Sequence, residues 1–417
     1  MLKALDIKLY PNLEQENYLA KLFGCYRKVY NLCLAKNDEL YSSEISGFTN
    51  LVSFTKYFHN DLVKDNELKY LNEHNTKILK DSLSNLGTAF KNFFKHGRGF
   101  PQFKSKSNDQ SIGLYKEAFS KKVFYIENKM FISSKFGLIK YRTSQEYKKY
   151  LEKYKDSIVR ITIKKTKSNE YFARVIVDSD IKGDRQRPTP INSIIGLDLG
   201  IKSFIVDSNG NEYENLKSYR NNAKQLVRLN RSLSRKVKGS NNRKKARIKY
   251  AKKWNRITNV KNNYLDLISS RLVDENQIIV IEDLNIKGMM KNKNLAKSIQ
   301  ELSLGKFREI LKYKCKWYDR LLIVVDRFFP SSKICSGCGY KNKNLKLSDR
   351  EWVCPECGQI HNRDENAALN LKNYGIWMIL NNLDYENFKI YLENLTYDVS
   401  YLDLYLQKKN RVPNTQI

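Results

Sequence analysis

The sequence predicts an α/β protein of more than one domain, with a small metal-binding element near its C-terminal end. First, 417 residues are enough for two or three domains, each with its own hydrophobic core. Second, strand-like and helical patterns alternate along the chain, and the stretch RQRPTP (185–190) breaks both patterns, which predicts a domain boundary. Third, two CxxC pairs lie at the spacing C-x₂-C-x₁₅-C-x₂-C.

The charge of the chain points to a polyanionic partner. Lys and Arg number 76 against 44 Asp and Glu, a formal net charge of +32. A field of this size attracts nucleic acid through counterion release, and an anionic membrane surface is the alternative. The chain shows no apolar run of transmembrane length and no signal-like start, so we expect no membrane partner and a cytoplasmic location. The hydrophobic content of 41% argues against a mostly disordered protein.

The first 180 residues combine a strand, helices and hairpins. KALDIKLY (3–10) reads as a strand ended by Pro11, and Asn12 is a candidate N-cap for a helix over 13–40. More helix is expected over 50–95, followed by the loop HGRGFPQFKSKS (96–107), which mixes Gly, Pro, cations and two phenylalanines. Two hairpins are then expected, one from KVFYI and KMFIS and one from VRITIKK and YFARVIVD.

The second half begins with three short strands, the first of which, IIGLDL, carries Asp198 near its end. A helical stretch over 215–275 follows, which Gly239 and Ser240 divide into two helices. Between Leu216 and Leu265 it holds 17 Lys or Arg and no Asp or Glu, which favours a surface for a polyphosphate over an ordinary solvated face. The strand QIIVIEDL, a helix over 297–320 and the strand LLIVVD complete the pattern before the cysteines.

Three separated acids lie where strands end or a helix begins. Asp198 and Glu282 end apolar strands, and Asp364 begins the helical pattern RDENAALNLKNY. A carboxylate at the end of a buried strand is costly to desolvate unless it is paired or binds a metal, and Mg²⁺ prefers carboxylate oxygens. Two Mg²⁺ ions held this way can support phosphodiester cleavage. Each acid also has a purely structural interpretation: Asp364 as a helix N-cap, and Asp198 as a turn residue before Gly200. Asp283 competes with Glu282, but adjacent strand residues face opposite ways, so only one of the two can join such a cluster.

The seven cysteines divide into two groups. Cys25, Cys33 and Cys315 lie in apolar, helical stretches and are expected to be core residues in a reducing compartment. The other four fit a structural Zn²⁺ site that fills the tetrahedron and leaves no open position, whereas a redox CxxC explains the double pair poorly. His361 is surplus to this set and is expected to be an ordinary polar residue. The predicted zinc ligands are Cys335, Cys338, Cys354 and Cys357.

Four motifs in order resemble one known family. IIGLDLGIKSF, IVIEDLNIKGM, RFFPSSKICSGCGYKN and CGQIHNRDENAALNL look like the transposon-associated TnpB (OrfB) family of RNA-guided DNA nucleases, relatives of type V CRISPR effectors. The N-terminal stretches YPNLEQENYLAKLFGCYRKVYN and RGFPQFKSK are also similar to that family. The resemblance covers about residues 1–375. Asn362 stands where many relatives have Asp, and the Tyr-rich acidic tail matches no motif.

The resemblance implies a RuvC-like nuclease of RNase H-like fold, with Asp198, Glu282 and Asp364 as catalytic acids and Mg²⁺ ligands. It implies that a guide RNA and a double-stranded DNA target are the partners and that a short flanking DNA motif is read. The sequence does not determine the oligomeric state, for which a monomer is favoured. It further implies a wedge-like β-barrel domain (1–40 and 115–185) with an inserted helical recognition domain (41–114), a RuvC-like nuclease domain (190–330 and 359–375) with an inserted four-cysteine zinc ribbon (331–358), and an unassigned tail (376–417), which we expect to be a packed helical cover.

Three alternatives stay open at this point. An RNA-guided DNA-binding regulator would need the same basic surfaces without cleavage. A transposase would act on element ends without RNA, since RNase H-like folds also serve that chemistry. A zinc-ribbon RNA-binding protein would leave the three acids unexplained.

Overall fold

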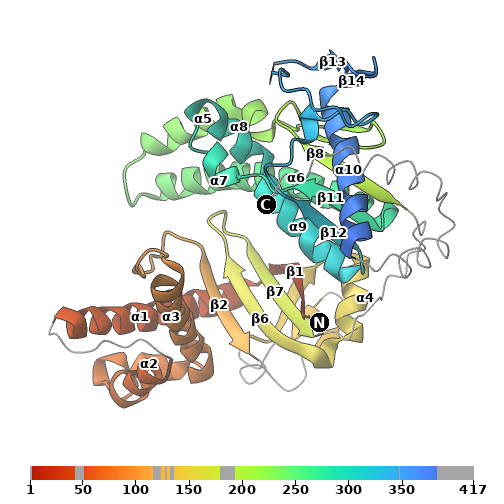
Figure 1. The fold of residues 1–417 in the computed structure, drawn as a ribbon. Helices are drawn as coiled ribbons and strands as arrows, with labels where there is room; N and C mark the ends of the chain where they lie inside the picture. The colour runs from red at the N-terminus through yellow and green to blue at the C-terminus, as the bar shows by residue number, and fades with distance from the viewer. Residues whose placement is uncertain are drawn as a thin grey trace. The chain divides into compact units, whose positions relative to one another are not determined.

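The computed structural model describes residues 2–42, 51–115, 124–126, 129–131, 136–178, 193–346 and 348–382 (Figure 1). The chain forms two compact units, one of Met1–Asp180 with Leu229–Lys252 and one of Ile181–Arg228 with Lys253–Ile417. The predicted boundary at 185–190 lies outside the described residues. No helix in the described part of the chain has both the length and the apolar character needed to span a bilayer.

The first unit contains a seven-stranded antiparallel sheet in the order β2-β6-β7-β1-β5-β4-β3 (Figure 1). Both predicted hairpins are present, as β3 with β4 and as β6 with β7. The apolar residues Leu5, Ile7 and Leu9 alternate along β1 and are buried, as expected of a strand with one face on a core. The strands are β1 (Leu2–Tyr10), β2 (Gln110–Tyr115), β3 (Phe124–Ile126), β4 (Lys129–Phe131), β5 (Leu138–Arg142), β6 (Ile158–Lys165) and β7 (Tyr171–Asp178).

Helices supply the rest of the first unit. The predicted first helix is α1 (Leu13–Ser42), and Asn12 caps it as expected, since its Oδ1 accepts from the Gln15 N–H at 2.8 Å. The helical stretch expected over 50–95 is confirmed but broken into several pieces. Cys25 and Cys33 are buried in the core, as predicted. The other helices are α2 (Leu51–Tyr57), the π-helical turn η1 (Phe58–Leu62), the 3₁₀ helix η2 (Asn66–Glu73), α3 (Thr76–His96), α4 (Gln145–Lys153) and η3 (Lys155–Ser157).

The second unit is built on a five-stranded sheet in the order β10-β9-β8-β11-β12. The first three strands form an antiparallel meander, while β8, β11 and β12 run parallel. The predicted strands and the turn at Asn209-Gly210 are confirmed, and Gly210 has the positive φ of 83° that such a turn requires. The strands are β8 (Ile194–Leu199), β9 (Ser203–Asp207), β10 (Glu212–Glu214), β11 (Ile278–Glu282) and β12 (Leu321–Val325).

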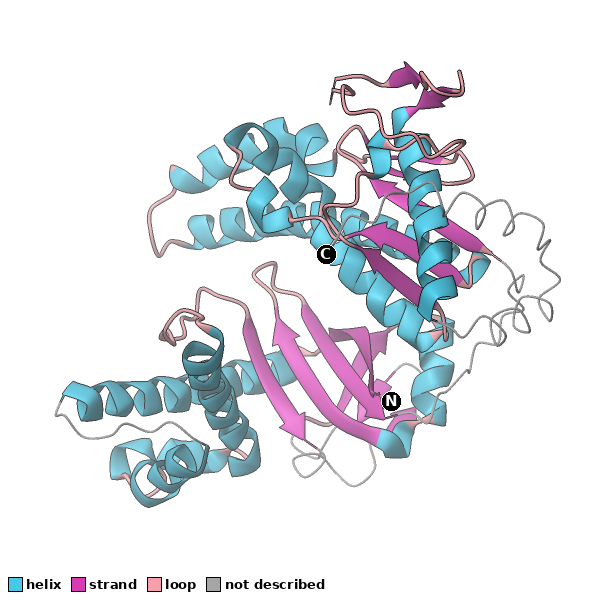
Figure 2. Ribbon diagram, viewed as in Figure 1, coloured by secondary structure: helices cyan, strands magenta, loops and turns pink. Residues whose placement is uncertain are grey.

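Helices cover both faces of this sheet (Figure 2). On one face, Leu197 and Ile281 pack against α6 (Asn241–Glu275) and α9 (Leu304–Trp317). On the other face, α10 (Arg363–Asn382) lies so close to β8 that a Cβ on Gly196 would be 2.1 Å from the carbonyl oxygen of Ala368. Glycine at this position therefore allows the close approach of α10 to the strand that carries Asp198.

The long basic stretch forms α5 (Ser218–Ser234) and α6 (Asn241–Glu275), with the division at Gly239-Ser240 as predicted. The prediction of a single helix over 297–320 is wrong in one respect. It is two helices, α8 (Lys293–Leu302) and α9 (Leu304–Trp317), because Ser303 adopts a left-handed conformation with φ of 57° and ends α8. Cys315 is buried, as predicted.

Short elements complete the described part of the second unit. They are α7 (Ile286–Met289), the 3₁₀ turn η4 (Ser331–Lys333), and the hairpin of β13 (Glu351–Val353) with β14 (Ile360–Asn362). Helix α10 continues past residue 375 to Asn382, so the start of the predicted tail extends this helix. The expected helical cover over 383–417 lies outside the described residues.

Candidate active site and cysteine cluster

Strand alternation places Asp198 and Glu282 on the face of the sheet that α10 covers. Strands β8 and β11 are parallel neighbours, and the register pairs Ile281 with Leu197, one position before the two acids. Leu197 and Ile281 point into the core on the opposite face, so Asp198 and Glu282 point toward α10. The first turn of α10 carries Asp364.

The field at Asp198 shows that the three acids share one region. Burial raises the pKa of Asp198 to about 8, and the negative charges of Glu282 and Asp364 contribute to the rise. The guanidinium groups of Arg363 and Arg350 act in the opposite direction. The structure therefore brings the charges of Glu282 and Asp364 close enough to Asp198 to oppose its ionisation.

Glu282 is held by a residue that precedes the cysteines. Burial raises the pKa of Glu282, while the hydroxyl of Ser331 donates a hydrogen bond to Glu282 Oε1 and works to lower it. Ser331 is itself buried, in η4. The sequence analysis did not single out this serine.

Asp364 is paired with two arginines. Arg350 Nη1 lies 3.1 Å from Asp364 Oδ2, and Arg363 Nη2 lies 3.1 Å from Asp364 Oδ1. The alternative role of Asp364 as a helix N-cap is wrong, because Asn362 Oδ1 accepts the backbone N–H groups of Asp364 and Glu365 at 3.0 and 3.3 Å. Asn362, the departure from the family pattern, is therefore the residue that caps α10.

Asp283 is engaged elsewhere. Its Oδ1 accepts from Arg308 Nη1 at 2.6 Å, and its Oδ2 pairs with Arg327. Hydrogen bonds from Arg327 and Arg308 lower the pKa of Asp283, so this acid is stabilised in its charged form. The two neighbouring acids thus differ as strand alternation requires: Glu282 lies beside Asp198, and Asp283 pairs with arginines.

Two asparagines on α10 fasten the segment that leads from β12 to the cysteines. Asn370 Nδ2 donates to the carbonyl oxygens of Ser331 and Ile334 at 2.7 and 2.6 Å. Asn366 Nδ2 donates to the same Ile334 oxygen at 2.7 Å, and its Oδ1 accepts from Ser336 N–H at 2.9 Å. These asparagines are buried and join the segment that holds Glu282 to the helix that carries Asp364. The sequence analysis missed them, although two Asn four residues apart on an otherwise apolar helix face were a usable signal.

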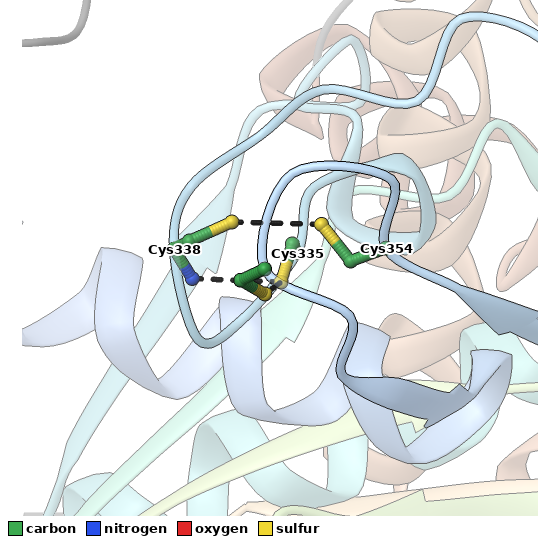
Figure 3. A group of neighbouring side chains, drawn as sticks. Cys335, Cys338 and Cys354 are labelled. Atoms are coloured by element: carbon green, nitrogen blue, oxygen red, sulfur yellow. Dashed lines mark hydrogen bonds between the residues drawn. The ribbon is translucent and has the colours of Figure 1, made fainter.

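The four cysteines form a compact group whose sulfur atoms all lie within 4.8 Å of one another. The Sγ atoms of Cys338 and Cys354 are 3.5 Å apart, those of Cys335 and Cys357 are 3.7 Å apart, and Figure 3 shows the first three cysteines turned toward one another. Burial raises the pKa of the Cys338 thiol to about 12. Burial also acts to raise the pKa of Cys354, but backbone N–H groups of Cys357 and Glu356 bring it to about 7. Four sulfur ligands at this spacing fit a structural zinc ion.

His361 is more than an ordinary polar residue. It is 4% exposed, its Nε2 lies 3.0 Å from Cys335 Sγ, and its ring lies 4.8 Å from that of Trp352. Burial lowers its pKa, which favours the neutral ring. His361 thus contacts one of the four cysteines from outside the group, a contact that the sequence alone does not indicate.

Within the described ranges, the cysteines are the only group of three or more His, Cys, Asp or Glu side chains brought close enough to hold a metal ion. The three acids share a field, but the arginine pairs of Asp364 occupy part of its coordination capacity. The donor set of Asp198, Glu282 and Asp364 consists of carboxylate oxygens, which suits a hard cation such as Mg²⁺.

Cations line other surfaces. Most Lys and Arg side chains on α5 and α6 are exposed, as expected for a face that meets a polyanion. In the first unit, a cavity of about 630 Å³ beside α1 is lined by Lys21, Arg27 and Lys28 among other residues.

Comparison with known proteins places the chain in a family. Family models match residues 173–293 ("Probable transposase"), 1–46 ("Helix-turn-helix domain") and 305–371 ("Cas12f1-like, TNB domain"). Within residues 1–46, the structure describes one strand, β1, and one helix, α1.

Similar proteins cover almost the whole chain. A Streptomyces pristinaespiralis protein named "Putative RNA-guided DNA endonuclease" is 34% identical over 379 residues, which is 90% of this chain and 89% of that protein. An Escherichia coli protein named "Putative RNA-guided DNA endonuclease InsQ" is 26% identical over 89% of this chain and 91% of its own length. A chain from the cryo-EM structure of the Cas12f1–sgRNA–target DNA complex aligns with 15% identity over 89% of this chain and 98% of its own, with a TM-score of 0.49. The chain belongs to the TnpB (OrfB) family.

Proposed function

We propose that this chain is an RNA-guided, Mg²⁺-dependent endonuclease that cleaves double-stranded DNA next to a short flanking motif. The observation that carries the catalytic part is that Asp198 and Glu282 lie on the face of the sheet that α10 covers, and that the first turn of α10 carries Asp364. The names of the relatives support the RNA-guided part. The net charge of +32 supports a nucleic-acid partner.

We assign the second unit to an RNase H-like (RuvC-like) nuclease domain. An antiparallel meander continued by two parallel strands, with helices on both faces, supports this assignment. The cysteine segment enters between β12 and α10 and fits a zinc ribbon inserted just before the last acid. In the first unit, the seven-stranded sheet supports the wedge-like barrel domain, and α2, η2 and α3 support the inserted helical recognition domain.

Asp198, Glu282 and Asp364 would hold the catalytic magnesium. When bound, two Mg²⁺ ions supply charge neutralisation at the phosphate and a water nucleophile. The chain itself fixes the acids: Ser331 orients Glu282, while Arg350 and Arg363 orient Asp364. Because like charges crowd Asp198, a cation at the site would favour its ionised form and lower its raised pKa. The zinc at the four cysteines would be structural, since no ligand position remains open.

The partners follow from the family and from charge. A guide RNA would pair with one DNA strand, and the exposed cations of α5 and α6 would contact phosphates of the duplex. We expect the protein to act as a monomer in the cytoplasm.

The test is to express the gene with its native downstream flank and to sequence the RNA that co-purifies. A single structured RNA ending in element-flanking sequence is expected, and the complex should cleave DNA that matches this RNA only when Mg²⁺ is present. Asp198→Ala and Glu282→Ala should abolish cleavage, whereas Asp283→Ala, a change at the adjacent acid, should leave cleavage measurable. Heterogeneous RNA, or cleavage that survives Asp198→Ala, would refute the proposal.

A transposase is the second candidate, because the family model over residues 173–293 carries that description. It predicts DNA-end binding and strand transfer in the absence of RNA. Strand-transfer products from RNA-free protein would favour it. DNA binding guided by RNA without cleavage would instead favour a regulator.

A further inference from the structure

The end of α3 and the loop after it expose an unusual set of aromatic rings. Phe94 is 56% exposed, Phe100 39% and Phe103 56%, although large apolar side chains are normally buried. Lys and Arg residues alternate with them in the same stretch of the chain, and residues 82–108 contain no Asp or Glu. We call this surface the Phe–Lys patch; its residues are Phe93, Phe94, Phe100 and Phe103 with Lys91, Lys95, Arg98 and Lys106, all four cations being exposed.

Three of the rings, Phe93, Phe94 and Phe100, form one connected cluster with a buried base. Phe93 lies edge-on to Phe100, with centroids 5.4 Å apart and planes at 84°, and is 5.1 Å from Phe94. Phe90 is fully buried, and its ring centroid lies 6.3 Å from that of Phe94 and 5.6 Å from that of Phe100. The exposed rings of Phe94 and Phe100 are therefore held by packing on Phe90 and do not depend on a partner for their positions.

The loop that carries Phe100 and Phe103 is fastened at both ends. Gly97 ends α3 in a left-handed conformation with φ of 57°, and Pro101 is buried. Asn31 on α1 exchanges two hydrogen bonds with the backbone of Lys104, at 2.8 and 3.0 Å. The ammonium group of Lys104 lies 4.0 Å from the centroid of the Tyr30 ring. A fixed loop presents its rings at little entropic cost on binding.

The chemistry of the patch selects its partner. Flat aromatic faces surrounded by cations, with no acid in the segment, match a polyanion that also offers flat apolar faces, which describes unpaired nucleobases on a phosphate backbone. Bases inside a duplex hide their faces by stacking on one another, whereas a structured RNA displays unpaired bases permanently in loops and ends. A protein or peptide partner would give no reason for the excess of cations.

We propose that the Phe–Lys patch stacks unpaired bases of the guide RNA, with its cations on the adjacent phosphates. The proposal rests on the proposed function, since it assumes that a guide RNA is bound. It assigns to this surface a role in holding RNA before any DNA target arrives.

The test asks whether RNA binding requires flat aromatic rings at these positions or only apolar side chains. The full-length chain with Phe94→Leu and Phe103→Leu keeps apolar side chains but loses two stacking faces, while Phe94→Trp and Phe103→Trp keep them. Phe328→Leu, a change at a phenylalanine that is 85% exposed and lies in the second unit, is the matched control. Each protein is titrated with the RNA that co-purifies with the wild type, at two salt concentrations, and with DNA of the same sequence in single- and double-stranded form.

The double leucine variant should bind the RNA at least about tenfold more weakly, since one stacked base is worth a factor of this order or more. The tryptophan variant and the Phe328→Leu control should bind like wild type. The salt dependence should be unchanged in the leucine variant and weaker in Lys91→Gln with Lys95→Gln, because only the latter removes phosphate contacts. Because the substituted rings are exposed, unfolding temperatures should not move.

The outcomes separate the two proposals. Wild-type protein that binds no RNA overturns the proposed function and this inference with it. Wild-type protein that binds RNA while the leucine variant binds equally well overturns the inference alone. A loss confined to double-stranded DNA would also overturn it and would assign the patch to the target.

Discussion

Replacing Gly196 by alanine tests whether the contact between β8 and α10 positions the acids. An added Cβ would lie 2.1 Å from the carbonyl oxygen of Ala368 and 2.6 Å from the backbone nitrogen of Lys372. Both are backbone atoms of α10, so no side-chain rotation can relieve the clash. The helix has to move by roughly 1 Å to restore ordinary contact distances in a close-packed interior.

The displacement has two expected consequences. Overpacking of this kind costs about 1–3 kcal/mol of the free energy of unfolding. Gly196 lies two residues before Asp198, and Ala368 lies one helical turn after Asp364, so the shift changes the spacing of the acids. A misplacement of about 1 Å at a reacting centre can reduce the rate by about 10²-fold.

The assay is single-turnover cleavage of matched DNA by the RNA-loaded protein, with urea unfolding measured in parallel. Gly305→Ala is the control in the same unit, because the nearest atom to its added Cβ is the Ile286 Cδ1, at 3.4 Å. Gly196→Ala should lose both stability and rate, and Gly305→Ala neither. A Gly196→Ala protein that cleaves and unfolds like wild type would refute the role given to this contact.

Four further predictions address charge, metal and packing. In metal-free protein, the raised pKa of Asp198 means that the folded state keeps a proton that the unfolded state has lost. The free energy of unfolding should therefore fall between pH 5 and 7 by up to about 1.4 kcal/mol per pH unit. Asp198→Asn should remove this slope, and equal slopes in the two proteins would contradict the prediction. Burial lowers the pKa of Lys104 to about 8, so the folded state binds fewer protons than the unfolded state above that pH; stability should rise from pH 8 to 10 in wild type but not in Lys104→Met, as measured by urea unfolding. Cys354→Ser should release zinc, measured by elemental analysis, and lower the unfolding temperature; full zinc content would show that this sulfur is not a ligand. Asn370→Ala removes the side-chain donor of the Ser331 carbonyl and one of the two side-chain donors of the Ile334 carbonyl, and should cost about 1–3 kcal/mol in urea unfolding, whereas an unchanged midpoint would mean that these hydrogen bonds are dispensable.

Much of the fold could be predicted from the spacing of apolar residues and from the residues that begin and end helices and strands. The apolar strands ending in Asp198 and Glu282 can be predicted, because short apolar runs that contain Ile are bounded by acids and turn residues. Asn12 and Gly239-Ser240 carry the local chemistry of a cap and a break. The division at Ser303 could not be predicted, since serine has no intrinsic preference for the left-handed region. Tertiary packing of α8 and α9 decides the conformation there.

Some features of the candidate site could likewise be predicted from the sequence, and others could not. Strand alternation predicted only that one of Glu282 and Asp283 could join the cluster, and the family resemblance pointed to Glu282. The arginine pairs of Asp364 could not be predicted, because Arg350 lies 14 residues away in the chain and reaches Asp364 only through the fold of the cysteine segment. The contact of His361 with Cys335 depends on the β13–β14 hairpin in the same way.

The most direct test is cleavage of a double-stranded DNA by the protein loaded with its co-purified RNA, with and without Mg²⁺, in wild type and in Asp198→Ala. We expect wild type to cut only DNA that matches the RNA and only with Mg²⁺, and Asp198→Ala to bind the same DNA without cutting it. Cleavage by Asp198→Ala at the wild-type rate, or cleavage by wild type that ignores the RNA sequence, would contradict an RNA-guided nuclease built on these three acids.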